Sequence, residues 1–64
     1  MCVLGENLRK ARTEKGLTLV EVAKEVGVSH VAIINMENGK RMPSVPTLVL
    51  LARVLGKSID ELVK

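Results

Sequence analysis

The residues that could carry out chemistry in this chain are few, and most of them lie between positions 18 and 41. His30 is the only histidine, and Ser29 directly precedes it. Neighbouring residues of a helix point about 100° apart, so this pair cannot act as a nucleophile and its base. Nucleophilic catalysis also needs a third group that orients the base. The sequence therefore predicts that the protein is not an enzyme and has no catalytic residues.

The chain has too few cysteine and histidine residues for an internal disulfide or a metal site. Cys2 is the only cysteine, and no Cys and His cluster has the spacing of a metal site, so we expect no disulfide, metal ion or other cofactor. Because no basic residue adjoins it, Cys2 is expected to be a small apolar residue without function. Gly5 interrupts the apolar start of the chain, and no run approaches the roughly 18 apolar residues of a membrane span. We expect a reducing cytoplasm and no membrane partner.

The remaining polar residues fit the binding of a polyanion better. Lys40 and Arg41 form a basic pair, and the chain carries a net charge of +3 with a pI near 9.4. This positive charge is compatible with the binding of a nucleic acid, although such a basic pair can also be simply exposed to solvent in a polar loop. The absence of Phe, Tyr and Trp argues against single-strand binding, because those binders stack bases on aromatic rings.

The elements that must position these residues are about five short helices of one domain over residues 1–64, separated by Gly, Pro and Ser. They are expected to run from Val3 to about Lys15, from Thr18 to Val26, from Ser29 to about Asn38, from Ser44 to Leu55, and from Ser58 onward. Two capping boxes, Thr18 with Glu21 and Ser58 with Glu61, indicate helix starts. A core without aromatics must be built from Leu, Val, Ile, Ala and Met.

The segment from residue 19 to residue 36 is typical of two helices that cross steeply around a tight turn. Ala23 is small where the two helices approach, and Gly27 permits a positive φ in the turn. Val28, Ile33 and Met36 are apolar residues that anchor the second helix of the pair. These intervals predict a helix-turn-helix.

With these residues in place, the sequence resembles the lambda repressor and Cro-like helix-turn-helix domains, the xenobiotic-response-element type of regulator. The resemblance covers nearly the whole chain and rests on Leu8, Arg12, Gly16, Leu17, Thr18, Val22, Ala23, Val26, Gly27, Val28, Ser29, Ile33, Glu37, Gly39, Pro43, Leu48, Leu51, Ala52, Leu55 and the closing segment from Ser58 to Leu62. It implies a compact, all-α, five-helix lambda repressor-like fold in which helices two and three form the helix-turn-helix. It also implies a salt bridge between Arg12 and Glu37.

The resemblance further implies a DNA-binding transcriptional regulator whose third helix lies in the major groove of double-stranded DNA, while the second helix crosses the backbone. The residues that it places at the groove are Ser29, His30, Val31, Ile34 and Asn35, and those near phosphates are Thr18, Leu19, Lys40 and Arg41. A homodimer on a two-fold site is expected, since one unit contacts only a few base pairs.

The expected groove face departs from the family pattern. Leu19, Val20, Val31 and Ile34 stand where relatives usually carry polar groups, and the outer face of the third helix has no Arg, Lys or Gln. Only His30 and Asn35 remain there as hydrogen-bonding side chains, and each can equally be an ordinary solvent-facing residue. Apolar side chains in the major groove contact mainly thymine methyl groups.

Other interpretations therefore stay open. The domain can be a protein-interaction module that binds a partner through Leu19, Val20, Val31 and Ile34. Leu50, Val54 and Val63 can form a homodimer seam, or the aliphatic residues can simply be spread over the surface of a domain without aromatics. A sequence engineered mainly for its fold is a further alternative, suggested by the missing aromatics and the two capping boxes.

Overall fold

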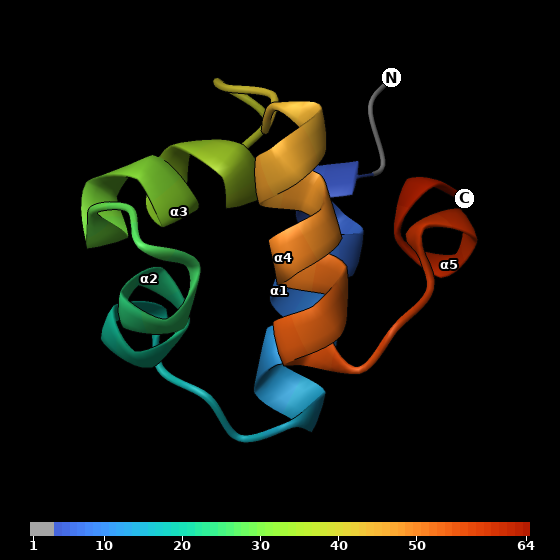
Figure 1. The fold of residues 1–64 in the computed structure, drawn as a ribbon, viewed down its shortest axis with the longest axis horizontal. Coiled ribbons are helices and arrows are strands. Elements are labelled where there is room, and N and C mark those ends of the chain that lie inside the picture. Colours follow the sequence, from blue (N-terminus) through green and yellow to red (C-terminus); the bar gives the residue numbers. More distant parts are fainter. Residues whose placement is uncertain (1–3) are drawn as a thin grey trace.

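Five α-helices and no strand make up residues 4–64, the part of the chain that this computed structural model describes. The helices are α1 (Leu4–Glu14), α2 (Leu19–Val26), α3 (His30–Glu37), α4 (Val45–Leu55) and α5 (Ile59–Val63). In Figure 1, α4 crosses the middle of the view in front of α1, with α2 and α3 to one side and α5 to the other. The expected all-α fold is confirmed, while Cys2 and Val3 lie outside the described residues.

Local capping signals set the helix starts. The backbone N–H of Glu21 donates to Thr18 Oγ1 over 3.1 Å, and the N–H of Thr18 donates to Glu21 Oε1 over 2.9 Å. Ser58 and Glu61 exchange the same pair of bonds over 3.1 and 3.0 Å. Both expected capping boxes are confirmed, and each satisfies backbone N–H groups that the first helical turn leaves without an intrahelical partner.

The core is entirely aliphatic and takes side chains from all the helices, namely Leu4, Leu8, Ala11, Val22, Ala23, Val26, Ala32, Ile33, Met36, Leu51, Ala52, Leu55 and Leu62. Ala23, Ile33 and Met36, which the helix-turn-helix pattern places at the contact between α2 and α3, all lie in this core. In α5, Leu62 is 1% exposed and Ile59 is 39% exposed, so Leu62 is the residue that this helix buries.

Backbone contacts hold α1 against the rest of the molecule. A Cβ on Gly5 would lie 2.5 Å from the carbonyl oxygen of Glu37 and 2.7 Å from that of Met36. Because glycine has no Cβ, α1 and the end of α3 can approach more closely here than any other residue would allow. Asn7 Nδ2 donates to the carbonyl oxygen of Leu62 over 2.7 Å, which ties α1 to α5.

None of the helices in the described range is long and apolar enough to cross a membrane.

Candidate nucleic-acid interface

A short turn with two backbone hydrogen bonds to Ala23 joins α2 to α3. Gly27 has a φ of 85°, and its N–H donates to the carbonyl oxygen of Ala23 over 2.8 Å. The N–H of Val28 donates to the same oxygen over 3.0 Å. Ser29 then caps α3, its Oγ accepting from the N–H of Ala32 over 3.2 Å. The expected tight turn is confirmed, and it fixes the direction in which α3 leaves α2.

The outer face of α3 is a mixed polar and apolar surface. His30 and Val31 are exposed, with 52% of Val31 accessible, and Ile34 and Asn35 are half-buried. On the opposite side of the helix the side chains are buried in the core. The four residues expected on the outer face are therefore all at least partly accessible to a ligand.

The basic loop after α3 is bonded directly to that helix. The backbone N–H groups of Lys40 and Arg41 donate to the carbonyl oxygen of Asn35 over 2.9 and 3.2 Å. Both basic side chains are exposed. The structure thus brings this pair of cations next to the last turn of α3, where the sequence alone could only place them in a loop.

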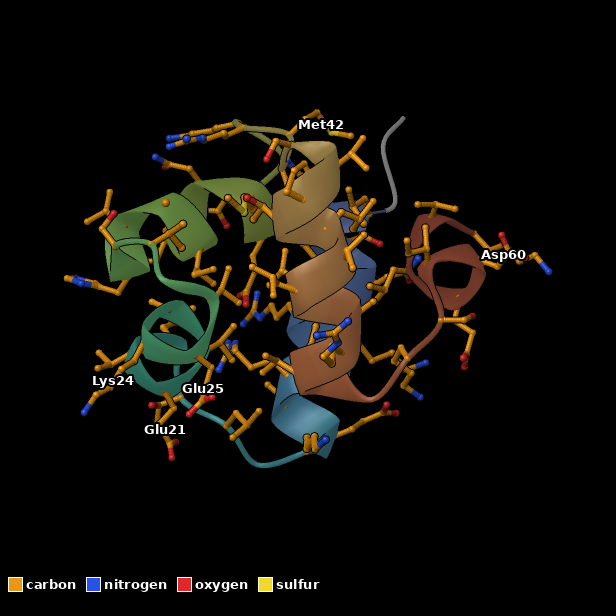
Figure 2. All side chains as sticks on the ribbon, in the orientation of Figure 1. Glu21, Lys24, Glu25, Met42 and Asp60 are labelled. Atoms are coloured by element: carbon orange, nitrogen blue, oxygen red, sulfur yellow. The ribbon has the colours of Figure 1, made fainter. Side chains whose placement is uncertain are left out.

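The beginning of α2 carries both a cap and a negative charge. Thr18 is exposed, Leu19 is half-buried, and Val20 is 60% exposed. Hydrogen bonding from the backbone N–H and the side chain of Thr18 lowers the pKa of the Glu21 carboxyl below its usual range, so this group is ionised at neutral pH. Figure 2 shows Glu21, Lys24 and Glu25 pointing away from the rest of the molecule, and all three are exposed.

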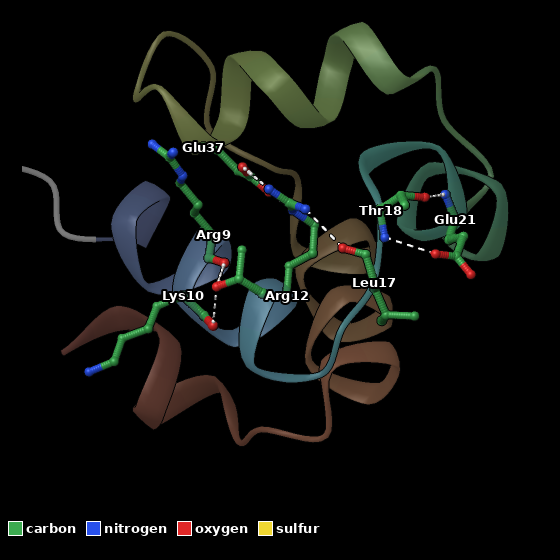
Figure 3. A network of polar contacts seen from close by, with 8 residues as sticks. Arg9, Lys10, Arg12, Leu17, Thr18, Glu21 and Glu37 are labelled. Atoms are coloured by element: carbon green, nitrogen blue, oxygen red, sulfur yellow. Dashed lines mark hydrogen bonds and ion pairs between the residues drawn. The ribbon is translucent and has the colours of Figure 1, made fainter.

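A partly buried ion pair holds the helix-turn-helix against α1. Arg12 Nε lies 2.7 Å from Glu37 Oε2, and Arg12 Nη2 lies 3.3 Å from Oε1, while Nη1 donates to the carbonyl oxygen of Leu17 over 2.8 Å (Figure 3). The two side chains are 14% and 7% exposed. The implied salt bridge is confirmed, and each of the three guanidinium nitrogens of Arg12 makes a bond within the domain, which gives Arg12 a structural role.

One cation beside this site was missed by the sequence analysis. A shallow hollow between α1, the start of α2 and α3 is lined by Arg9, Arg12, Leu19, Ile34, Glu37 and Asn38. Arg9 is exposed, and Figure 3 shows its side chain reaching from α1 toward the end of α3. The helical spacing from Arg9 to Arg12 was a usable signal, because residues three apart share a helix face.

The other expected apolar surface lies on α4 and α5. Leu50 and Val63 are exposed, whereas Val54 is half-buried against the core. The carbonyl oxygen of Val54 also accepts a bond from Lys15 Nζ over 3.1 Å. Within residues 4–64, no group of three or more His, Cys, Asp and Glu side chains is placed to hold a metal ion.

Comparison with known proteins identifies the family. The family model described as helix-turn-helix matches residues 8–62. The HTH-type transcriptional regulator y4dJ of Sinorhizobium fredii is 44% identical over 61 residues, which cover 95% of this chain and 79% of y4dJ. YqaE of Bacillus subtilis, another HTH-type transcriptional regulator, is 36% identical over 62 residues, and the chain spans 97% of its own length but only 53% of YqaE.

The solved structures agree with this match. The P22 c2 repressor protein, in complex with a synthetic operator, has a TM-score of 0.93 and 33% sequence identity. The similarity covers 100% of this chain and 97% of the repressor chain. The described fold is thus that of a lambda repressor-like domain, and the chain belongs to the helix-turn-helix family.

Proposed function

We propose that this chain is the DNA-binding unit of a transcriptional regulator and that α3 lies in the major groove of duplex DNA. The observation that carries the proposal is the arrangement at α3, whose outer side chains are accessible and whose following loop presents Lys40 and Arg41 beside them. The relatives support it, since y4dJ and YqaE are named as transcriptional regulators and the P22 c2 repressor was solved with an operator. An α-helix fits the width of the major groove.

Phosphate contacts are assigned to the residues at the edges of this face. Lys40 and Arg41 are exposed cations at the end of α3, and Arg9 adds a third beside the hollow. At the start of α2, Thr18 is exposed, and its hydroxyl can exchange its bond to the Glu21 carboxyl for one to a phosphate. The N–H of Leu19 lies in the first helical turn and can donate as well.

Base contacts are assigned to the outer residues of α3. The amide of Asn35 can bond both N6 and N7 of adenine, and His30 can bond a base edge or a phosphate. Ser29 keeps its hydroxyl hydrogen for a donor bond, because its oxygen serves as the helix cap. Val31 and Ile34 supply the apolar part of the contact.

Dimerisation is part of the proposal. One domain of this kind contacts only a few base pairs, so two copies on a two-fold site would be needed for useful specificity. The proposed contact between copies consists of the exposed Leu50 and the half-buried Val54 on α4 and the exposed Val63 on α5. The proposed cellular location of the protein is the cytoplasm.

The test is a titration of isotope-labelled protein with mixed-sequence duplex DNA at two salt concentrations, followed by backbone amide shifts. Shifts at Thr18, at residues 29–35 and at Lys40 and Arg41 are expected. Affinity should fall steeply with salt, because phosphate binding releases counterions. Amides that stay unmoved at low salt would overturn the proposal.

A second candidate function is supported by the exposed apolar side chains. Val20 and Val31 are 60% and 52% exposed, which is compatible with a protein partner docking on the helix-turn-helix. Apolar docking depends little on salt, whereas DNA binding loses affinity as salt rises. The same titration therefore separates the two functions.

A further inference from the structure

The outer face of α3 has an unusual chemistry for a helix that contacts base edges. Its eight residues, HVAIINME, include no Arg, Lys or Gln, and its one charged side chain, Glu37, is engaged by Arg12. Val31 is 52% exposed, and Ile34, three residues later, lies on the same side of the helix. Ile34 also lines the hollow together with Leu19, so the apolar surface continues toward the start of α2. The centre of the face is thus apolar.

The major groove offers one kind of apolar group to such a surface. Thymine carries a methyl group at C5, whereas the other edges presented in the groove are hydrogen-bond donors and acceptors. Cytosine methylated at C5 carries the same group at the same ring position. The Cβ atoms of residues three apart on a helix are about 5 to 6 Å from each other. Successive base pairs are about 3.4 Å apart, so Val31 and Ile34 would meet pyrimidines on nearby pairs.

The charges around this apolar centre favour DNA as its occupant. Lys40 and Arg41 are held beside the last turn of α3 by bonds to the Asn35 carbonyl, and Arg9 lies at the edge of the hollow. A polyanion with apolar groups between its two rows of phosphates matches an apolar strip between cations. An ordinary protein partner would have to supply acidic groups at the same places.

We propose that Val31 and Ile34 recognise C5-methyl groups, so that the domain prefers thymine or 5-methylcytosine to unmethylated cytosine at the contacted positions. The inference rests on the proposed docking of α3 in the major groove. Methylation of cytosine in a binding site would then raise the affinity of the protein for that site without any small-molecule effector. The C5-methyl group would thus be a part of the DNA that the protein contacts, and its addition to cytosine would regulate the affinity of the protein for that DNA site.

The test begins with a duplex selected from a random library for binding to the intact protein. It is resynthesised with uracil in place of single thymines, which removes only the C5-methyl group. At contacted positions Kd should rise about fourfold for each methyl group lost, the effect of exposing one methyl group. At the same positions, a duplex with 5-methylcytosine should bind about fourfold more tightly than its cytosine counterpart.

The matched variants are Val31→Ser, which removes both methyl groups of the side chain, and Val45→Ser on α4, where Val45 is 73% exposed and lies outside the proposed DNA and dimer contacts. V31S should reduce the difference between thymine and uracil duplexes at the position that Val31 contacts, and V45S should retain it. Equal binding of thymine and uracil duplexes by the unmodified protein, with salt-dependent binding intact, would overturn methyl recognition and leave the proposed function standing. Failure to bind any duplex at low salt would overturn both.

Discussion

A single added methyl group at Gly5 tests how closely α1 packs against α3. In G5A the new Cβ would lie 2.5 Å from the Glu37 carbonyl oxygen, and an ordinary contact begins at 3.4 Å. The two helices would have to separate by about 0.9 Å, the difference of those distances. The obstructing atoms belong to the backbone, so no side chain can rotate away.

Two opposing effects decide the magnitude. Replacing a helical glycine with alanine stabilises a helix by about 1 kcal/mol when nothing obstructs it. Overpacking costs about 1 to 3 kcal/mol, and contact with rigid backbone favours the upper end. The expected net loss is about 2 kcal/mol, a large part of the roughly 3 to 10 kcal/mol that stabilises a domain of this size.

The assay is urea unfolding followed by far-ultraviolet circular dichroism, since the chain has no Trp or Tyr to report by fluorescence. A loss of 2 kcal/mol should lower the urea midpoint by roughly 1 to 2 M. Lys10→Ala is the control, because Lys10 is exposed on the same helix and should change stability by less than about 0.5 kcal/mol. If G5A is more stable than the unmodified protein, the close approach of α1 and α3 is wrong.

Three further predictions follow from other contacts. Arg12→Ala should cost about 3 kcal/mol in urea unfolding, because it leaves the buried Glu37 carboxylate without its partner; a loss below about 1 kcal/mol would contradict this. Lys40→Ala with Arg41→Ala should reduce the slope of log affinity against log salt by about 2, and Lys10→Ala should leave it unchanged. Backbone donation lowers the pKa values of Glu21 and Glu61 below 4.5, so their contribution to stability is present above that pH and lost as pH falls through the lowered values. Unfolding between pH 7 and pH 3 should show this loss, and Glu21→Gln, which keeps the cap but does not titrate, should reduce it.

The features that the sequence predicted correctly are governed by neighbouring residues. The two capping boxes join residues three apart, and the turn at Gly27 depends on one positive φ, so a short window contains all the information. The buried stripe of α3 follows from its helical period. In each case the physical cause lies within one or two helical turns.

The features that escaped prediction depend on contacts between distant segments. Asn7 bonds the carbonyl of Leu62, 55 positions away, and Lys15 bonds that of Val54, 39 positions away. Gly5 reads in the sequence as a simple break, and only the approach of α3 gives it a packing role. Arg9 is exposed, and only the fold places it beside Leu19 and Ile34 at the hollow. The contacts of each site residue with DNA stay predictions until the titration is done.

The bonds from Lys40 and Arg41 to the Asn35 carbonyl also bear on the entropy of association. Ordering the backbone of one residue costs about 1 to 2 kcal/mol, and here two residues are ordered before any ligand arrives. The roughly 2 to 4 kcal/mol involved corresponds to at least about 30-fold in Kd. On the proposed phosphate contacts of the loop, that advantage would be the same for every DNA sequence. It would strengthen binding to non-specific DNA as much as binding to the specific site, and discrimination between sequences would be left to the side chains of α3.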